Sequence, residues 1–215
     1  MQGNGPGKTV VLNTDYDMDE EDLAWLNTAP EDLWCLDKLI LARYLGYTCG
    51  PVGTPVPQEG YYMVRPCVNA IGLGLGAQKH YIKDSTNHLT PGHFWCEWFE
   101  GDHISVDYDW GKQCLAVQGF KAPGTFTRWD RWIRVDDVKI KMPAFLGSIR
   151  VKYSKINCEY IGGKLIEVHL RHNPDFPGNR QEYIPVWQGQ NECPPQGYEY
   201  IEDPDVHGRI GAWVR

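Results

Sequence analysis

The sequence lacks any long hydrophobic run. No apolar stretch approaches the ~20 residues that a membrane-spanning helix requires. The first thirty residues also lack a basic start followed by an apolar segment, the pattern of a secretory signal. We therefore expect no membrane partner and a cytoplasmic location.

Positive charge is scarce as well. The 21 Lys and Arg residues face 28 Asp and Glu residues, so the formal net charge is −7 and the pI is about 5.5. A protein whose main role is to bind the phosphate backbone of a nucleic acid normally has more basic than acidic residues. Nucleic acid is therefore not expected as the main partner. A local basic cluster at Arg128, Arg131 and Arg134 indicates the exposed face of a strand, with contact to an anionic acceptor as the alternative.

Diagnostic spacings of cysteine and histidine are missing too. The seven cysteines form no CxxC pair, and an odd number fits a reduced compartment better than a disulfide framework. His80, His88, His93 and Cys96 show no spacing typical of a zinc site. Gly7-Lys8-Thr9 has neither the glycine spacing nor the preceding strand of a phosphate-binding loop. No Ser/His/Asp or Cys/His pair carries a local signature of nucleophilic catalysis.

Strand and helix patterns alternate along the 215 residues, without an internal repeat. This interleaving predicts an α+β protein whose sheets are covered by helices. Helices are predicted from residue 28 to about 44, ended by Gly46, and from 143 to about 154. Strands are predicted at 9–12, 61–65, 94–99 paired with 104–108 in one hairpin, 129–140, and in two arms of 155–171. From 174 onward, Pro, Gly and Gln predict an irregular tail with at most a short strand at 184–187.

The last predicted hairpin turns on Gly162-Gly163, which supply the positive φ angles of a tight turn. Glu159 and Glu167 then lie near each other on adjacent strands. Two carboxylates brought together repel unless a cation separates them, so a divalent metal is a natural reason for the pair. Simple pairing would put Glu159 opposite Ile166, so a bulge or a longer turn is needed to bring the carboxylates into phase.

Glu167, His169 and Arg171 alternate with apolar Val168 and Leu170. The three polar side chains therefore share one face of the strand. A face that bears a carboxylate, an imidazole and a guanidinium can hold a metal and a phosphate together. The alternative is a solvent-facing strand of a half-buried sheet, where the same alternation is common.

Two short motifs precede this hairpin in the first half of the chain. Asp37-Lys38 opens a predicted helix that ends at Gly46. Val64-Arg65-Pro66 ends a strand and leads into a loop with glycine at alternate positions, namely Gly72, Gly74 and Gly76.

Two more motifs follow in the second half. Glu97-Trp-Phe-Glu-Gly101 comes after an apolar strand, and His103 lies at the start of the next one. Asn157-Cys-Glu159 and Glu167-Val-His-Leu-Arg171 complete the series. In order and in type, the motifs resemble those of the ATP-grasp family of ligases over residues 37–171.

The resemblance implies an ATP-grasp-like α+β fold, with two α+β lobes whose antiparallel sheets enclose a nucleotide cleft. Residues 1–30 would be a short remnant of the family's separate N-terminal domain. Residues 31–96 would form the small lobe with its Gly-rich loop, and residues 97–175 the large lobe with the metal site. Residues 176–215 would be an irregular tail packed on the body.

The resemblance also implies an ATP-dependent, ADP-forming ligase. A carboxylate substrate would be phosphorylated to an acyl phosphate, and an amine or similar nucleophile would then displace the phosphate. Small-molecule or peptide carboxylates and amines are the implied substrates, and ATP with Mg²⁺, or Mn²⁺, the implied cofactors.

Residue roles follow from the same resemblance. The nucleotide would be bound by Lys38, Arg65, Gly72, Gly74, Gly76, Glu97, Trp98, Phe99 and His103. The metal ligands would be Glu159, Glu167 and His169. Arg65 and Arg171 would be catalytic, with Arg171 meeting the acyl phosphate.

Departures from the family pattern keep other functions open. Arg65 stands where lysine is usual, although a guanidinium binds phosphate well. His169 replaces asparagine and offers a nitrogen, which suits magnesium less and can admit manganese. These changes and the reduced N-terminal part favour a degenerate ATP-grasp-fold module that binds a nucleotide or a partner without catalysis. A β-rich domain that binds a glycan or peptide through its many Trp and Tyr residues is the remaining alternative.

Overall fold

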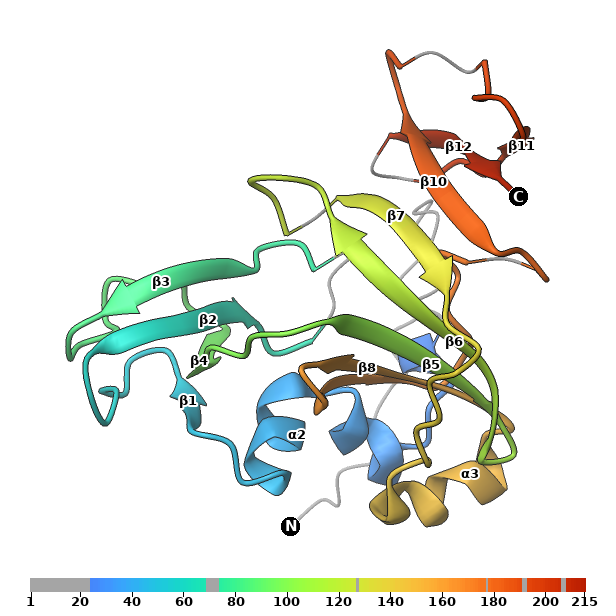
Figure 1. The fold of residues 1–215 in the computed structure, drawn as a ribbon. Coiled ribbons are helices and arrows are strands. Elements are labelled where there is room, and N and C mark those ends of the chain that lie inside the picture. Colours follow the sequence, from blue (N-terminus) through green and yellow to red (C-terminus); the bar gives the residue numbers. More distant parts are fainter. Residues whose placement is uncertain (1–23, 69–73, 127, 177, 191–192, 206–207) are drawn as a thin grey trace, which may run out of the picture.

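The computed structural model describes residues 24–68, 74–126, 128–176, 178–190, 193–205 and 208–215. These residues form two antiparallel sheets and a few short helices, so the predicted α+β class with antiparallel sheets is confirmed (Figure 1). The strand predicted at 9–12 lies outside the described residues.

The smaller sheet has four strands in the order β1-β4-β2-β3. They are β1 (Cys49–Pro51), β2 (Gly60–Pro66), β3 (Gln78–Ile82) and β4 (His93–Glu97). The predicted strand at 61–65 is β2. Tyr62 and Val64 of this strand alternate into a small core with Ile82 and Trp95, as a half-buried sheet requires.

The larger sheet has eight strands in the order β11-β12-β10-β7-β6-β5-β8-β9. They are β5 (His103–Asp109), β6 (Lys112–Lys121), β7 (Trp129–Arg134), β8 (Lys155–Ile161), β9 (Lys164–His169), β10 (Glu182–Trp187), β11 (Glu199–Glu202) and β12 (Arg209–Val214). The predicted hairpin at 155–171 is β8 and β9. The strand predicted at 129–140 is shorter and ends at Arg134.

The prediction that 94–99 and 104–108 form one hairpin is wrong. β4 pairs with β1 and β2 in the smaller sheet, whereas β5 pairs with β6 and β8 in the larger one. The residues between β4 and β5 cross from one sheet to the other and pass over the β8–β9 turn. There the Gly162 N–H donates to the Asp102 carbonyl at 3.0 Å. A Cβ on Gly162 would lie 2.1 Å from the Glu100 carbonyl oxygen, so this crossing requires glycine.

The prediction of an irregular C-terminal tail is also wrong. β10, β11 and β12 extend the larger sheet, and Tyr183, Ala212 and Val214 belong to a core with Trp132. Pro185 lies inside β10, opposite Ala212. The short strand predicted at 184–187 is part of β10, although proline cannot donate to the ladder and so weakens the pattern of a strand. The pattern did not reveal β11 and β12.

The helices are short. They are the 3₁₀ helices η1 (Pro30–Cys35) and η2 (Ala144–Gly147), and the α-helices α2 (Lys38–Tyr44) and α3 (Ile149–Lys152). The single helix predicted from 28 to 44 is divided, because the Asp37 side chain accepts the Ile40 N–H at 2.9 Å and so caps a new helix. Gly46 follows this helix at a φ of +74°. None of the helices in the described ranges has the length and apolar character to cross a membrane.

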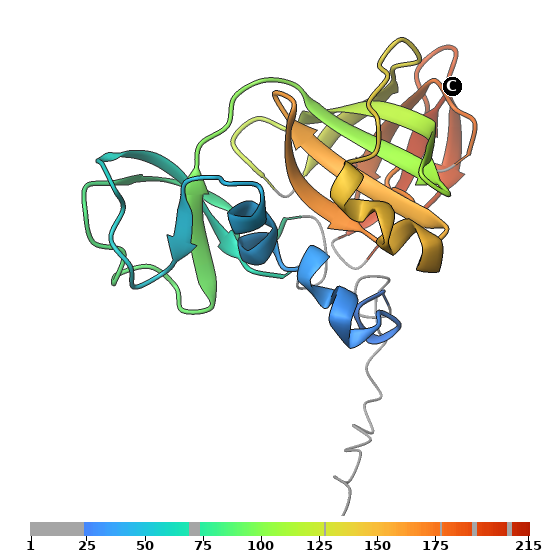
Figure 2. The ribbon, with the colours of Figure 1, turned by 90° about the horizontal axis from the view of Figure 1, so that it is seen from below.

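The helices cover one face of the larger sheet. Leu41 of α2, Leu146 of η2 and Ile149 of α3 pack into a core with Val106 and Val168 of the sheet. α2 contacts both β1 of the smaller sheet and β9 of the larger one. The helix therefore lies at the junction of the two sheets, as Figures 1 and 2 show.

Candidate functional site

The β8–β9 hairpin brings two carboxylates opposite each other. Glu159 pairs directly with Glu167, because the register shifts between Glu159 and Tyr160. The bulge that the phase of the two residues required is therefore present. Behind the carboxylates, Val168 and Leu170 pack into the core beneath the sheet.

Two cations from outside the larger sheet meet these carboxylates. Lys38, the first residue of α2, is only 4% exposed, and its Nζ lies 3.0 Å from Glu167 Oε1. Arg65 of β2 places Nη1 3.5 Å from Glu167 Oε2, and its Nη2 donates to the Ile166 carbonyl at 2.7 Å. Helix α2, the smaller sheet and the larger sheet therefore each supply a charged side chain to one cluster, here called the junction cluster: Lys38, Arg65, His103, Glu159, Glu167 and His169.

Two imidazoles complete the junction cluster. His103 Nε2, on β5, lies 2.9 Å from Glu159 Oε2, and its ring meets the ring of Trp129 edge-on at 4.7 Å. His169 Nε2, on β9, lies 3.4 Å from Glu167 Oε1 and 3.9 Å from Glu159 Oε1. His169 thus lies within reach of both carboxylates that the sequence singled out.

The charges in the junction cluster keep both carboxyl groups ionised. Burial alone would raise the pKa of Glu167, but Lys38, His169 and Arg65 outweigh it and hold the pKa below its usual value. Burial opposes ionisation of Glu159 as well, and the hydrogen bond and charge of His103 lower its pKa. The pKa of Lys38 is lowered, chiefly by burial. The cluster therefore offers anionic oxygens and buried cations side by side.

Lys121, at the end of β6, is a buried cation near the cluster that sequence reasoning missed. Its Nζ donates to the Phe126 carbonyl at 2.8 Å and lies 3.3 Å from the centroid of the Trp129 ring. Burial lowers the pKa of Lys121 to about 8, although the charges of Glu159 and Asp175 raise it. No predicted strand or motif included Lys121, so the sequence pattern gave no sign of its role.

Arg171 is the second residue after the end of β9. Its Nη1 donates to the carbonyl of His172 at 2.9 Å, and the side chain is half-buried.

The residues expected near adenine lie in and beside the crossing between the sheets. The Glu97 carboxylate accepts the Thr48 N–H at 2.8 Å. Trp98 receives the Lys79 ammonium over its ring at 4.1 Å, and Phe99 packs edge-on against Tyr47 at 4.8 Å. These contacts tie the crossing to the smaller sheet.

The glycine loop is only partly within the described residues. Gly72 lies outside them. Gly74 and Gly76 adopt φ angles of +66° and +79°, which favour glycine. A Cβ on Gly76 would lie 3.1 Å from His93 Nε2, so this close approach also favours glycine at position 76.

The three expected metal ligands do not converge on one empty point. Lys38 and Arg65 hold the Glu167 oxygens, and His103 holds a Glu159 oxygen. Even so, the donor set suits Mg²⁺, since both carboxylates are ionised and lie in register. The buried Nε of Arg65 makes no hydrogen bond with the described residues, so this donor can serve an anion.

The comparisons by sequence and by structure give different results. No protein-family model matches the sequence, and no curated protein matches it. Solved structures do match. Several of those that match are named as ATP-grasp proteins.

Three of these structures illustrate the range of identity, TM-score and coverage. An ATP-grasp superfamily protein from Archaeoglobus fulgidus is 13% identical, with a TM-score of 0.48 over 84% of this chain and 63% of that one. D-alanine–D-alanine ligase from Bacillus anthracis, complexed with ATP, is 16% identical, with a TM-score of 0.34 over 63% and 55%. The ATP-grasp ligase PsnB, complexed with a phosphomimetic variant of its minimal precursor, Mg and ADP, is 12% identical, with a TM-score of 0.36 over 63% and 49%.

Two of these three structures carry the name of the family that the sequence motifs resemble. This chain spans about half to two thirds of the length of the matched chains. At these identities and TM-scores the likeness indicates no ligand or reaction. Any function has to rest on the geometry of this chain.

Proposed function

We propose that this protein is an ATP-dependent ligase whose nucleotide phosphates bind at the junction cluster. One observation carries the proposal. Lys38 and Arg65 come from the helix and the smaller sheet, and they meet two ionised, in-register carboxylates of the larger sheet. Buried charges without a ligand role are costly to maintain, so their gathering at a junction between sheets favours a site over a scaffold.

The cations of the cluster suit the phosphates. Lys38 offers a compact ammonium and Arg65 a planar fork of donors, both of which bind phosphate oxygens. The Arg65 Nε already lacks a hydrogen bond with the described residues. On binding, phosphate oxygens replace Glu167 as the partner of Lys38, which releases that carboxylate for a metal. The backbone N–H groups around Gly72, Gly74 and Gly76 close over the phosphates, as glycine allows.

Glu159, Glu167 and His169 would hold Mg²⁺, with Mn²⁺ as the alternative because His169 offers nitrogen. When bound, the ion neutralises phosphate charge and orients the transferred group. His103 positions Glu159, since its Nε2 already lies 2.9 Å from that carboxylate. The side chains of Glu97, Trp98 and Phe99 flank the adenine side, with the ribose near His103.

The proposed reaction transfers the γ-phosphoryl group of ATP to a substrate carboxylate, forming an acyl phosphate and ADP. An amine or similar nucleophile then attacks the acyl carbon and phosphate leaves. Arg65 and Arg171 neutralise the charge on the phosphoryl group as it moves. Positioning and charge neutralisation do most of the work in such transfers. The substrates would be small molecules or peptides that carry a carboxylate or an amine.

The test is calorimetric titration with ATP in Mg²⁺ and in EDTA. We expect Mg²⁺ to tighten ATP binding to the wild type about tenfold or more, since a charged ligand interaction is worth roughly 2 kcal/mol. Glu167→Gln should remove most of this difference while the circular dichroism spectrum stays that of the wild type. Glu202→Gln, on the exposed face of β11, is the matched control and should keep it.

Glu159→Gln serves as a second variant, so that a folding defect in Glu167→Gln does not leave the question open. A wild-type protein that binds no ATP with or without Mg²⁺ contradicts the proposal. So does an unchanged Mg²⁺ effect in both folded variants.

A nucleotide-binding module without catalysis is the second candidate, and His169 favours it because asparagine is the usual residue there. The titration separates this candidate from a glycan- or peptide-binding domain. ADP formation in the presence of candidate carboxylates then separates the ligase from the module, and Glu167→Gln should abolish that ADP formation.

A further inference from the structure

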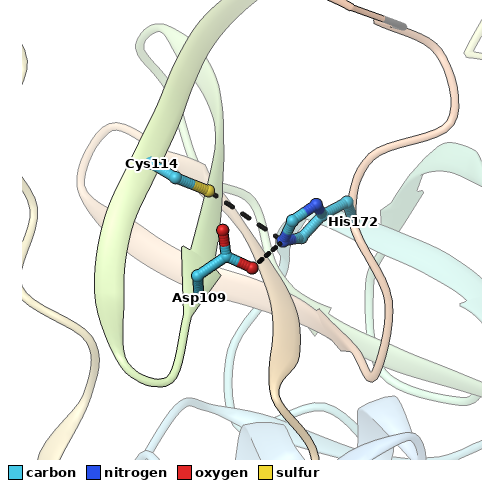
Figure 3. A group of neighbouring side chains, drawn as sticks. All are labelled: Asp109, Cys114 and His172. Carbon is cyan, nitrogen blue, oxygen red and sulfur yellow. Dashed lines mark hydrogen bonds and ion pairs between the residues drawn. The ribbon is translucent and has the colours of Figure 1, made fainter.

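A second group of potential metal ligands lies away from the junction cluster, beside the β5–β6 turn. Asp109 ends β5, Cys114 lies on β6, and His172 follows β9 (Figure 3). The ligand atoms of these three residues all lie within 4.8 Å of one another. In the described part of the chain, this trio is the group of His, Cys and carboxylate side chains that converges in this way.

The distances within the trio fit one cation. His172 Nε2 lies 3.1 Å from Asp109 Oδ1 and 3.9 Å from Cys114 Sγ. Tetrahedral zinc has bonds of about 2.0–2.2 Å to nitrogen and oxygen and about 2.3 Å to sulfur, so its ligand atoms lie roughly 3.3–3.6 Å apart. The two separations from His172 Nε2 lie on either side of this range, and the ligand atoms of Asp109 and Cys114 lie within 4.8 Å of each other, so side-chain rotation would bring the three atoms onto one ion.

The arrangement does not fit a catalytic relay. In a Cys–His–Asp relay the thiol and the carboxylate contact opposite ring nitrogens of the histidine. Here Cys114 Sγ and Asp109 Oδ1 both approach Nε2 of His172, as Figure 3 shows. Three donors that point toward a common place make a coordination site.

The backbone beneath the trio is held by a buried polar network. Asp107 Oδ1 accepts the backbone N–H of Asn173 and the side-chain amide of Asn157, each at 2.9 Å. The Asp107 carbonyl accepts the Cys114 thiol at 3.4 Å. Asp107 thus contacts both the strand that carries Cys114 and the segment that carries His172. Outer contacts of this kind orient metal ligands.

We propose that Asp109, Cys114 and His172 bind one Zn²⁺ ion or a similar borderline divalent cation. A thiolate, an imidazole and a carboxylate form a donor set that zinc favours and magnesium does not. The three protein ligands leave the fourth corner to water or to a group of the substrate, because the trio is at the surface.

The surroundings of Cys114 oppose ionisation of its thiol when no cation is bound. Burial and the nearby carboxylates of Asp109 and Asp107 raise the pKa of the thiol to about 11. In the absence of a cation the thiol is therefore a weak nucleophile at neutral pH. A bound dication favours the thiolate and removes the penalty that the carboxylates impose.

The site would also order the end of the β9 segment. His172 gives a side-chain ligand to the trio, while its carbonyl accepts the Arg171 guanidinium at 2.9 Å. A cation on His172 ties this segment to the β5–β6 turn. The zinc site stands independently of the proposed ligase function.

Titration with Co²⁺ as a spectroscopic substitute for Zn²⁺ tests the site on the full-length protein. We expect one Co²⁺ per chain, with a near-ultraviolet sulfur-to-metal charge-transfer band that Zn²⁺ abolishes. The junction cluster has no cysteine and cannot give such a band. Cys114→Ser should remove the band and weaken Zn²⁺ binding by more than the ~10–100-fold that outer-shell changes cause.

Cys193→Ser is the matched control, because Cys193 is also exposed and lies outside the trio. It should keep the band and the affinity. His172→Gln is a second ligand variant, used if Cys114→Ser does not fold, and should weaken Zn²⁺ binding similarly. A wild type without the band overturns the proposal, and so does a Cys114→Ser or His172→Gln variant that binds Zn²⁺ like the wild type.

Discussion

The junction cluster and the Asp109–Cys114–His172 trio bring metal-ligating side chains together in opposite ways. The junction cluster is buried, and its carboxylates are already engaged by Lys38 and Arg65. The trio lies at the surface, and its donors converge on one place. A ligand of the junction cluster must therefore exchange several buried ion pairs, whereas a cation at the trio replaces the exposed His172–Asp109 contact and the thiol proton of Cys114.

This difference follows from where the side chains come from. The junction cluster is assembled from α2, β2, β5, β8 and β9, so it depends on the two sheets meeting correctly. The trio comes from one turn and the segment just after β9. We therefore expect the junction cluster to be strongly linked to folding stability and the trio to be nearly independent of it.

The largest expected effect is the loss of stability on removing Glu167. Glu167→Ala leaves Lys38 and Arg65 buried without their partner, which should cost about 3–5 kcal/mol in the free energy of unfolding. Asp109→Ala, at the surface, should cost within about 1 kcal/mol. Urea denaturation of both variants measures the difference. Equal losses would contradict the contrast between the two clusters.

A double variant sharpens this comparison. Lys38→Met with Glu167→Leu removes the pair together and should cost less than Glu167→Ala alone, because only Arg65, and not Lys38 as well, then lacks the Glu167 carboxylate. Lys83→Met, at an exposed position, is the control for loss of a lysine. A double variant that is less stable than Glu167→Ala would mean that the attraction between Lys38 and Glu167 contributes more to stability than the burial of their charges costs.

Acid sensitivity should be the next largest effect. The folded pKa of Glu167 lies below the unfolded value of 4.5, so near this pH the folded state binds fewer protons than the unfolded state. The ion pairs of Glu167 therefore contribute their full stabilisation above pH 4.5. This stabilisation is lost as the pH falls through the folded pKa. Glu167→Gln should therefore lose less stability than the wild type between pH 5 and pH 3, whereas Glu202→Gln should follow the wild type. Unfolding curves at each pH measure both slopes.

A smaller effect of the same sign, in a higher pH range, is expected for Lys121. Its folded pKa of about 8 lies below the ordinary 10.5, so the unfolded chain holds more protons between these values and stability rises with pH there. Lys121→Met should remove this rise and keep the fold, while Lys83→Met should keep the rise. Denaturation at pH 7.5 and at pH 9.5 tests it. An unchanged rise in Lys121→Met would show that the lysine is not desolvated.

Local sequence predicted the hairpin well. Gly162-Gly163 specified the turn, and the alternation of Val168 and Leu170 with polar residues specified which face is buried. The phase of Glu159 and Glu167 even indicated the bulge that the structure contains. The Asp37-Lys38 motif matches the start of α2, whereas the helix pattern predicted one continuous helix from 28 to about 44.

Long-range pairing could not be predicted in the same way. The strand at 94–99 looks like a partner of 104–108, because the two are close in the chain and both apolar. Its real partners, β1 and β2, are decided by packing in the smaller sheet. The same holds for the contact between Lys38 and Glu167, which are 129 positions apart in the chain. The trio escaped notice because Asp109, Cys114 and His172 form no sequence motif.

The most direct measurement is a crystal structure of the protein with a non-hydrolysable ATP analogue and Mg²⁺. The account predicts phosphate oxygens within hydrogen-bond distance of Lys38 Nζ and Arg65, and a metal ion on Glu159 and Glu167. The Lys38–Glu167 contact, now 3.0 Å, should be broken. A nucleotide bound elsewhere, or a fully occupied analogue beside an intact Lys38–Glu167 pair, would contradict it.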